Sequence, residues 1–501
     1  MAIDPRSPVV VGVAQLVRRP EPATVASMPE PADMMAEVVR SAAEDSGAPD
    51  AVLRRLGSIQ VVRLLSWRYG NPALAVAERL GLDVADLAVS ANGGNSPQML
   101  INQAALSISR GELDAAAVVG AEANRTRLMA RAQGVEPHWS HQADDVAEPR
   151  HAGVERPGSS ETETSVGMAM PVQVYPLFEN ALRAAAGESI AEHQARIAGL
   201  WSRFSQVAAT NPYAWTPVAR TADEIATPGP DNRMIAFPYP KLMNANFQTD
   251  QAAAVLVMSA EAAEAAGVPR DRWVFLRAGA DAADHWFVSQ RQDLSSSPAI
   301  RIAGQAALHA AGVGADDVAH VDLYSCFPAA VQIAAAELGF GLDEADRPLT
   351  VTGGLAYAGG PWNNYVTHSV ATLCSALRRD PGSVGLATAL GWYVTKHAFG
   401  VYSTEPGPRG FAWSSPQAEV DSLPSRQAVT GVAATSAVET YTVLYDRDGS
   451  RTAGLVTSLL PDGTRALARV ADPSALEAMT EHEACGAPVT LSEDGTATVK
   501  I

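Results

Sequence analysis

SANGGNSPQMLINQAALSISRGELDAAAVVGAE, residues 90–122, predicts a strand, a loop of small residues, a helix and a second strand. Pro97 stands where a helix can begin, because the first turn needs no N–H from it, and Ser96 is placed to cap that helix. Ala115 to Val119 is an apolar run typical of a buried strand. The loop at residues 91–96 leaves backbone N–H groups at a helix N-terminus. Two interpretations follow: an ordinary tight turn of an α/β domain, or a cradle for a ligand.

The composition of the chain argues against several classes of function. The chain has 501 residues, 47% of them hydrophobic, and a net charge of −18, which disfavours nonspecific binding to nucleic acid or anionic membranes. Its three widely spaced cysteines are too few for a disulfide framework and favour a reducing compartment. The sequence has no signal-like start, no apolar run of about 18 residues, no metal-spaced cluster and no dinucleotide motif. We therefore expect a soluble, cytoplasmic protein without a metal, a nucleic-acid partner or membrane insertion.

The order of the predicted elements indicates two similar halves. An Ala-rich helix, a closing glycine and a buried strand occur in VVRSAAEDSG followed by SIQVVRLL, and again in AGQAALHAAG followed by HVDLYS. Strands alternate with helices, one of which is predicted over Pro328 to Leu338, and the last strands are predicted at Ser383–Ala389 and Gly400–Ser403. This alternation predicts an α/β fold with a mainly parallel sheet covered on both faces.

We divide the chain into four parts. Residues 1–268 form the first half and include residues 125–243, which break the strand-helix alternation and are predicted to form an inserted subdomain over one end of the sheet. Such excursions usually contact substrate; the alternative is a merely structural lid. Residues 269–410 form the second half, and residues 411–427 a linker that contains proline and serine. Residues 428–501 show short strands, Asp-Gly turns and one helix, which predicts a separate small β-barrel.

Four motifs, in order along residues 8–404, resemble those of the thiolase superfamily. SISRGELDAAAVVGAE resembles the family's helix-glycine-strand unit, and NANFQTDQAAAVLVMSAEAAEAAG resembles its Asn-Ala-Ser segment. DLYSCF is similar to the Asn-Glu-Ala-Phe loop, more closely to the His-Asp-Cys-Phe form of the sterol-carrier-linked thiolases, and GGLAYAGGPWNN resembles the Gly-His-Pro loop. The resemblance implies duplicated βαβαβαββ halves in a five-layer α-β-α-β-α arrangement. The C-terminal residues lie outside an ordinary thiolase and look like an OB-fold.

The resemblance also implies which positions would carry the family's chemistry, and none of them holds the usual residue. The acyl-accepting cysteine corresponds to Gly94, the activating histidine to Gly360, the second cysteine to Ala389 and the oxyanion asparagine to Tyr324. Glycine cannot form a thioester, so we expect weak or no classical thiolase activity. The backbone donors of the loop would remain, so the pocket could still hold a thioester carbonyl.

Further residues on or near the motif loops are candidates for catalysis or binding. Cys326 could replace the nucleophile if His368 or His397 lay close enough to act as a base; the alternative is a small buried thiol. Tyr324 and Tyr357 could act as acid or base if their pKa were lowered, whereas buried tyrosines are usually just packed. His397 could instead make a structural hydrogen bond. By resemblance, the candidate residues for binding coenzyme A are Asn244, Asn246, Gly353, Gly354, Gly359 and Gly360.

Three functions remain open. The first is a thiolase-like protein, of the acetyl-CoA acetyltransferase type by resemblance, which binds coenzyme A (CoA) or an acyl-CoA as a ligand, without a covalent cofactor, and transfers acyl groups weakly or not at all. The second is an aldol lyase acting on a 3-hydroxyacyl-CoA, in which Tyr324 or Tyr357 is the base. The third is a non-catalytic protein of lipid or sterol metabolism whose C-terminal domain docks a partner protein. The sequence leaves monomer and dimer undecided.

Overall fold

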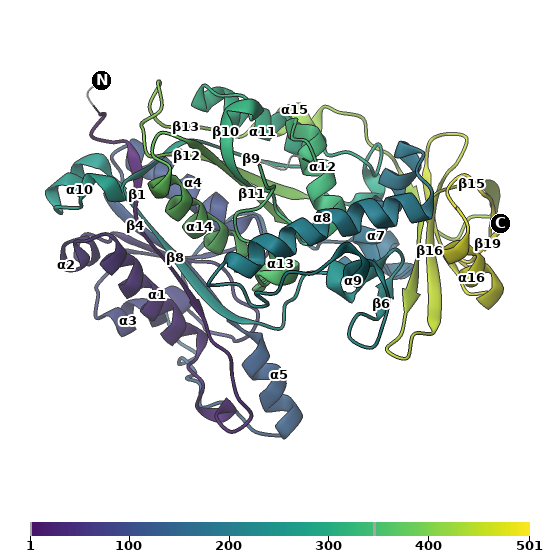
Figure 1. The fold of residues 1–501 in the computed structure, drawn as a ribbon, viewed down its shortest axis with the longest axis horizontal. Helices are drawn as coiled ribbons and strands as arrows, with labels where there is room; N and C mark the ends of the chain where they lie inside the picture. Colours follow the sequence, from purple (N-terminus) through teal and green to yellow (C-terminus); the bar gives the residue numbers. More distant parts are fainter. Residues whose placement is uncertain (1–2, 344–346) are drawn as a thin grey trace.

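A large mixed sheet forms the centre of the molecule (Figure 1). The computed structural model describes residues 3–343 and 347–501. The strands lie in the order β10-β11-β12-β9-β1-β8-β4-β2-β3-β5, and β13 also pairs with β9. Their bounds are β1 (Pro8–Val17), β2 (Ser58–Val61), β3 (Asp86–Ser90), β4 (Ala115–Ala123), β5 (Arg150–Ala152), β8 (Asp250–Ser259), β9 (Val274–Ala283), β10 (Val318–Asp322), β11 (Val384–Gly391), β12 (Lys396–Ser403) and β13 (Ala412–Ser414).

The prediction of a mainly parallel sheet is wrong for the centre of this sheet. β1 runs antiparallel to β8 and β9, and the pairs β4/β8, β9/β12 and β11/β12 are antiparallel as well. Parallel pairing occurs between β10 and β11, between β13 and β9, and among β2, β3, β4 and β5. Every residue of β8 is buried. A strand buried on both faces is a continuous apolar run whichever way its neighbours point, so the pattern predicted burial and not direction.

Helices lie outside the sheet and between its two halves, which confirms the five-layer thiolase-like arrangement (Figure 1). α4 and α14 occupy the middle layer: α4 packs against β4, β8 and β12, and α14 packs against β8 and β11. α1 and α3 cover the first half, and α11 covers the second with α12 beside it. The bounds are α1 (Pro31–Asp45), α3 (Pro72–Leu80), α4 (Ser96–Ser109), α11 (Pro298–Ala311), α12 (Pro328–Leu338) and α14 (Tyr365–Arg379).

The central position of α4 explains its composition. A helix buried on all sides needs small or apolar residues, and its polar groups must be paired. Gln98 and Asn102 are fully buried; Gln98 Nε2 donates to Asn102 Oδ1 at 2.9 Å, and the Tyr402 hydroxyl donates to Gln98 Oε1 at 2.8 Å. Ser96 is not the cap that we predicted, because the residue at the N-cap is Asn95 and the Ser96 hydroxyl donates to the Ala91 carbonyl at 2.8 Å.

Two long helices of the excursion at residues 125–243, α7 and α8, pack against α12. Glu179 on α7 lies at the centre of this contact: its carboxylate is 2.6 Å from His193 Nε2 on α8 and accepts from Gln332 Nε2 on α12 at 2.6 Å. The three helices are therefore joined through one fully buried carboxylate. The elements are α5 (Asn124–Gln133), α6 (Glu161–Ser165), α7 (Pro171–Ala186), α8 (Ile190–Thr210), α9 (Ala222–Ala226), β6 (Met234–Ala236) and β7 (Tyr239–Pro240).

The C-terminal residues form a second sheet that curls into a half-barrel, at the yellow end of the chain in Figure 1. Strand β6 of the excursion pairs with β15 of this sheet, and Arg183 on α7 forms an ion pair of 2.8 Å with Glu483. Residues 411–427, predicted as a linker, contain β13 and a short helix, α15. The elements are α15 (Gln417–Asp421), β14 (Ala428–Val429), β15 (Ala434–Tyr445), β16 (Arg451–Leu459), β17 (Arg465–Val470), α16 (Pro473–Glu481), β18 (Pro488–Leu491) and β19 (Ala497–Val499).

Strand β5, from the excursion, covers the outer edge of β3. Ala88 to Ser90 pair in parallel with Arg150 to Ala152, and the Arg150 guanidinium binds both carboxylate oxygens of Asp86 at 2.8 Å. An uncovered edge strand presents free N–H and C=O groups to other chains. The chain thus covers the strand that leads into the loop before α4 with its own backbone.

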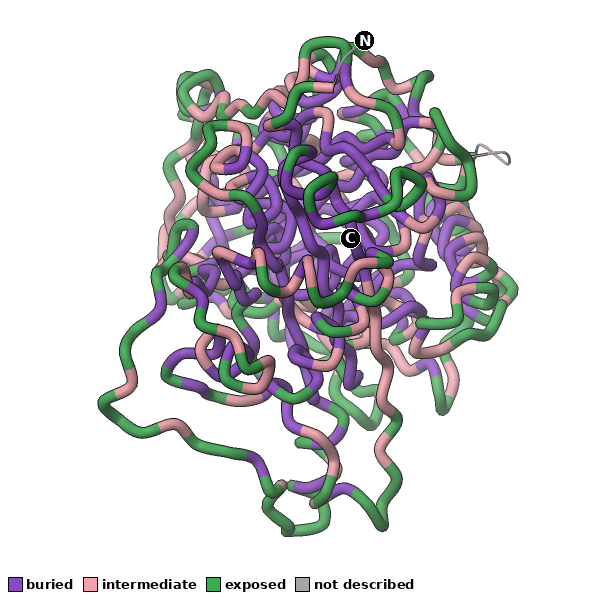
Figure 2. Tube along the Cα trace, turned by 90° about the vertical axis from the view of Figure 1, so that its left-hand side faces the viewer, coloured by how far each residue is buried: buried purple, intermediate pink, exposed green. Residues whose placement is uncertain are grey.

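Buried residues concentrate in the middle of the molecule, whereas the outer loops are exposed (Figure 2). The core divides into one cluster under α1 and α3, a larger one around α4, α8, α11 and α14, and a third inside the half-barrel. Within residues 3–343 and 347–501, no helix combines the length and the apolar character that crossing a membrane requires.

Candidate functional site

Loops from the four sequence motifs meet near the N-terminal end of α4. The Gly93 N–H donates to Asn363 Oδ1 at 3.0 Å. The Asn246 N–H donates to the Leu355 carbonyl at 3.0 Å, and the Asn246 carbonyl accepts from the Gly360 N–H at 2.9 Å. We call this meeting point the loop junction, and define it as residues 91–95, 244–247, 324–327, 353–364 and 389–391.

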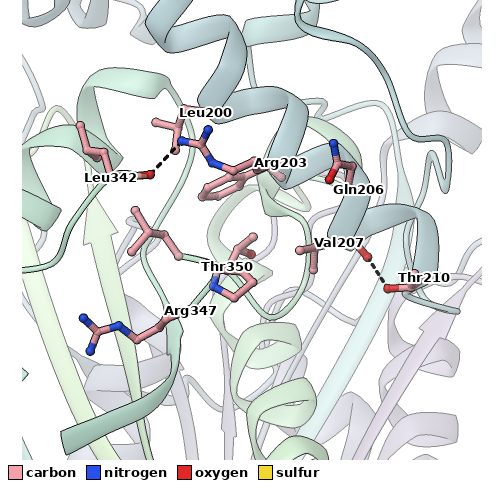
Figure 3. Close-up of a pocket in the computed structure, with 11 residues that line it drawn as sticks. Leu200, Arg203, Gln206, Val207, Thr210, Leu342, Arg347 and Thr350 are labelled. Atoms are coloured by element: carbon pink, nitrogen blue, oxygen red, sulfur yellow. Dashed lines mark hydrogen bonds between the residues drawn. The ribbon is translucent and has the colours of Figure 1, made fainter. Parts of the chain in front are cut away.

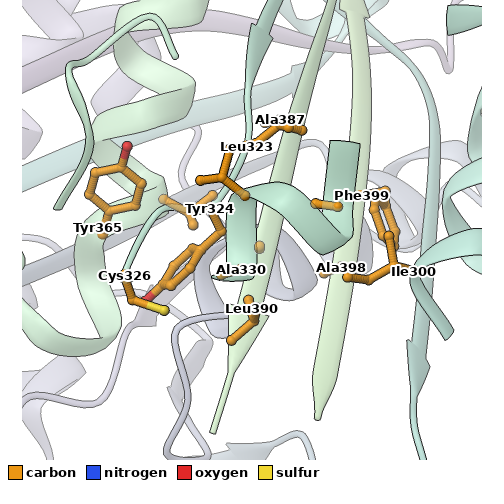
Figure 4. Packing of buried hydrophobic residues seen from close by; sticks show 14 of the residues in the cluster. Ile300, Leu323, Tyr324, Cys326, Ala330, Tyr365, Ala387, Leu390, Ala398 and Phe399 are labelled. Carbon is orange, nitrogen blue, oxygen red and sulfur yellow. The ribbon is translucent and has the colours of Figure 1, made fainter. Parts of the chain in front are cut away.

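Tyr324 occupies the space that a side chain at Gly94 would need. A Cβ atom at Gly94 would overlap Tyr324 Oη, and would lie 2.8 Å from Tyr324 Cζ and 2.5 Å from the Leu390 carbonyl oxygen. Figure 4 shows the Tyr324 ring between Cys326 and Leu390. Carbon atoms do not approach other heavy atoms so closely without a shift. The position that corresponds to the family's nucleophile therefore lacks room as well as a side chain.

The other family positions behave differently. Ala389 is buried on β11 directly before Leu390, so three of the four positions come together. At Gly360, a Cβ atom would lie 3.4 Å from the Asn246 carbonyl oxygen, which is an ordinary contact. Neighbouring Gly359 has φ +112° and needs glycine, because a Cβ there would overlap Gln251 Oε1. Position 360 can accept a side chain, and position 94 cannot without a rearrangement.

The two candidate tyrosines lie in the loop junction, in surroundings that raise the pKa of both hydroxyls. Burial raises the pKa of Tyr324 well above its usual value, and the nearby Cys326 acts in the same direction. Burial also raises the pKa of Tyr357, which lies at the end of the short helix α13 (Gly354–Tyr357). The Tyr357 hydroxyl is buried without a hydrogen-bond partner among the residues that the structure describes. Both hydroxyls stay protonated at neutral pH and can donate hydrogen bonds.

Cys326 is a buried thiol of low reactivity. Burial raises its pKa to about 12, partly offset by a hydrogen bond with Tyr175. His397 Nε2 lies 3.3 Å from Asp284 Oδ2 and 3.2 Å from the Val394 carbonyl, a structural arrangement. His368 Nδ1 lies 3.0 Å from Gln15 Oε1, and burial lowers the pKa of His368 to about 3. Within the part of the chain that the structure describes, neither histidine forms a hydrogen bond with Cys326.

The residues proposed for binding CoA line the loop junction, but their side chains differ in availability. Asn246 joins two loops through its backbone, whereas the Asn244 amide donates to the Pro240 carbonyl at 2.8 Å and leaves its Oδ1 buried and unpartnered among the described residues. Gly353 and Gly354 both have positive φ angles, +98° and +77°, and lie against Ala208 and Phe204 of α8. These two glycines bring the loop into contact with the excursion.

A lysine and a strained turn beside the loop junction were not predicted from the sequence. Lys396 begins β12, four residues before the predicted strand, and is 6% exposed. The turn between β11 and β12 holds Trp392 and Val394 at φ +57° and +54°, and Trp362 has φ +45°. Such values are rare outside glycine and concentrate at functional sites. The only sequence signal was the rarity of lysine, since the left-handed turn contains no Gly, Asn or Asp between Trp392 and Thr395.

Two cavities flank the loop junction. One of about 270 Å³ lies between α8 and residues 347–350 (Figure 3), with Arg203 at its rim donating to the Leu342 carbonyl at 2.8 Å. Its wall residue Phe204 also touches the Gly354 loop. The other, of about 10 Å³, is the size of one water molecule and is lined by Gln251 and His368, whose Oε1 and Nε2 atoms lack partners among the described residues.

Two family models match parts of the chain. The model described as "Thiolase-like protein type 1 additional C-terminal domain" matches residues 416–496, and the model described as "Thiolase C-terminal domain-like" matches residues 280–360. No curated protein matches the sequence. The half-barrel is thus a domain known from thiolase-like proteins.

Solved structures extend this result to the whole chain. A monomeric SCP2-thiolase like protein type 1 from Mycobacterium smegmatis is 33% identical over 100% of both chains, with a TM-score of 0.84. The Ltp2-ChsH2(DUF35) aldolase, at 18% identity over 80% of this chain and 98% of that one, shares the fold with a TM-score of 0.59. An acetyl-CoA acetyltransferase from Syntrophomonas wolfei does so at 15% identity over 80% and 99%, also with a TM-score of 0.59. The chain belongs to the SCP2-thiolase-like protein type 1 family, thiolase-superfamily proteins with an additional C-terminal domain.

Proposed function

We propose that this protein binds CoA or an acyl-CoA thioester at the loop junction and does not perform the cysteine-dependent acyl transfer of thiolases. The observation that carries the proposal is the pairing of Gly94 with Tyr324: the tyrosine fills the volume where an acylated side chain would stand. The loops that resemble the family's thioester-binding loops are nevertheless in contact with one another. Binding without a covalent acyl-enzyme is the function that best agrees with both facts.

The N-terminal end of α4 offers hydrogen-bond donors for a thioester carbonyl. Among the described residues, the N–H groups of Gly94 and Asn95 have no hydrogen-bond acceptor. Asn95 is 7% exposed, and its Oδ1 atom is also buried without a partner in that part of the chain. Unpaired buried polar groups are costly unless a ligand or water satisfies them. A carbonyl oxygen at this end of the helix would accept from the free N–H groups.

Calorimetric titration with CoA, acetyl-CoA and acetoacetyl-CoA tests the proposal, together with a thiolysis assay that follows acetoacetyl-CoA by absorbance. We expect saturable binding of at least one compound and no thiolysis. Asn363→Ala should weaken binding, because Asn363 holds Gly93 and Asn92 in place. Asn71→Ala is the matched control, since Asn71 is similarly buried but caps α3 away from the junction. Absence of binding across the panel, or CoA-dependent thiolysis, would overturn the proposal.

A second candidate is retro-aldol cleavage of a 3-hydroxyacyl-CoA, and the position of the Tyr324 hydroxyl favours it. That hydroxyl stands at the position of the family's nucleophile, where it would face the reacting part of a bound substrate. With its pKa raised by burial, Tyr324 would act as a hydrogen-bond donor to the developing enolate, and another group would have to take the proton. Turnover of a 3-hydroxyacyl-CoA that Tyr324→Phe abolishes and Tyr357→Phe preserves would support this candidate. Equal turnover in both variants would reject it.

A further inference from the structure

Lys396 is an unusual residue for this chain. Three of the 37 basic residues are lysines, namely Lys241, Lys396 and Lys500. Lys241 and Lys500 are exposed, whereas Lys396 is 6% exposed. A buried lysine is costly unless it is paired, and no carboxylate in the described residues forms an ion pair with Lys396. An amine of this kind at the edge of a loop junction suggests chemistry and not only packing.

The surroundings of Lys396 direct its amine toward the loop before α4. Its Nζ donates to the Asn92 carbonyl and lies 5.8 Å from the centre of the Trp286 ring. A Cβ atom at Gly93 would lie 2.7 Å from Nζ, and a Cβ at Gly391 would lie 2.9 Å from Lys396 Cε. The two glycines therefore provide the space through which the amine reaches the loop. The same Gly93 position lies 2.6 Å from Asn95 Oδ1, the unpartnered amide oxygen at the N-terminus of α4.

The charged groups near Lys396 do little to balance the positive charge of its protonated amine. Glu155, on the excursion, favours the charged form, but it already pairs with Arg63 at 2.9 Å. Arg156 also lies over the Trp286 ring, with its Cζ 5.2 Å from the ring centre, and adds a further positive charge nearby. Burial is the largest effect and lowers the pKa of Lys396 to about 8. About half of such amines are neutral at pH 8, compared with under about 1% of an ordinary lysine.

We propose that Lys396 accepts a short acyl group from a thioester held at the loop junction. The inference rests on the proposed function, since the thioester must bind there first. The neutral amine attacks the thioester carbonyl, the new N–C bond forms as the C–S bond breaks, and CoA leaves as a thiol with the proton that nitrogen loses. The product is an amide on Lys396. Because Gly93, Gly391 and Trp286 lie close around the amine, we expect acetyl groups to react faster than long acyl chains.

Mass spectrometry of the full chain after incubation with acetyl-CoA at pH 8 tests this step, with peptide mapping of all three lysines. Lys241 and Lys500 serve as internal controls. We expect the acetyl occupancy of Lys396 to exceed theirs at least about tenfold, because its neutral fraction is larger. Lys396→Arg should remove the modification, whereas Lys241→Arg should leave it unchanged. Lauroyl-CoA should label Lys396 less than acetyl-CoA does.

The outcomes separate this inference from the proposed function. CoA binding in the calorimeter without preferential acetylation of Lys396 overturns the inference and leaves the proposed function intact. If CoA does not bind, the proposed function fails, and S-acetyl-N-acetylcysteamine, a small thioester that needs no CoA recognition, decides the reactivity of Lys396 alone. Labelling of Lys396 no faster than that of Lys241 by this reagent also overturns the inference. Circular dichroism of Lys396→Arg confirms that a lost modification does not reflect unfolding.

Discussion

Replacing Gly94 by alanine adds one methyl group to the tightest contact of the loop junction. The new Cβ would overlap the Tyr324 hydroxyl and lie 2.5 Å from the Leu390 carbonyl oxygen. Overpacking of this kind costs about 1–3 kcal/mol of stability. Tyr324→Phe removes the overlapping hydroxyl, for which no hydrogen-bond partner is recorded in the described residues, so we expect it to cost less than about 1 kcal/mol.

The double variant Gly94→Ala/Tyr324→Phe should therefore be more stable than the sum of the single changes predicts. The Leu390 contact remains, so the rescue is partial, and we expect a coupling of at least about 0.5 kcal/mol. Urea unfolding followed by circular dichroism gives the free energies, provided that the slope stays constant across the four proteins. Gly229→Ala is the control for added volume, because a Cβ there meets no atom within 4 Å. Additive single effects, or a Gly94→Ala protein as stable as Gly229→Ala, would refute the assignment of Tyr324 to this space.

Three further predictions address activity, pH and the C-terminal domain. Gly94→Cys/Gly360→His places the family's cysteine and histidine at the two corresponding positions. We expect this variant to show no thiolysis of acetoacetyl-CoA, because Tyr324 still fills the space that the cysteine side chain needs. Measurable turnover in the absorbance assay would contradict the steric argument. Burial raises the pKa of Glu122 from 4.5 to about 7, so its contribution to stability is full below pH 4.5 and is lost as the pH rises through 7. Urea midpoints measured at pH 5 and pH 8 should fall less in Glu122→Gln than in the wild type, and identical falls would reject the assignment. Arg465→Ala should destabilise the half-barrel by about 3 kcal/mol, because it removes a fully buried guanidinium and leaves the half-buried Glu439 and the carbonyls of Ser289 and Arg291 without that partner. Arg469→Ala on the exposed face should have little effect in the same unfolding assay.

The order of the motifs predicted the fold well, because each motif is set by residues that are close together in the sequence. The helix over Pro328–Leu338 has the bounds predicted for it, since a first-turn proline and a closing glycine mark both ends. The strand at the end of the second half was predicted to start at Gly400 and starts at Lys396. The preceding turn holds Trp392 and Val394 in a left-handed conformation that contacts with Tyr175 and Gly158 maintain, and no local signal reveals such contacts.

The position of the candidate site could be predicted from the sequence, but the packing of side chains within it could not. The family positions at Gly94 and Tyr324 were identified by comparison of motifs, and the loss of the cysteine was evident. That Tyr324 fills the space at Gly94 depends on a contact between residues 230 positions apart, which no local pattern encodes. Lys396 was missed for a similar reason, because its burial depends on Gly93, Gly391 and Trp286 together.

The exchange at Gly94 and Tyr324 also restricts how this lineage can change. A chain that acquired a cysteine at position 94 in one mutational step would suffer a clash with Tyr324 and Leu390, and so would lose stability before it gained any activity. Loss of the tyrosine alone would remove one of these two contacts, leave the contact with the Leu390 carbonyl and bring no nucleophile. A side chain at position 94 therefore requires a second change at position 324, and neither change alone supplies both the nucleophile and the space for it. A requirement for stability would therefore favour chains that keep glycine at position 94 for as long as they keep tyrosine at position 324.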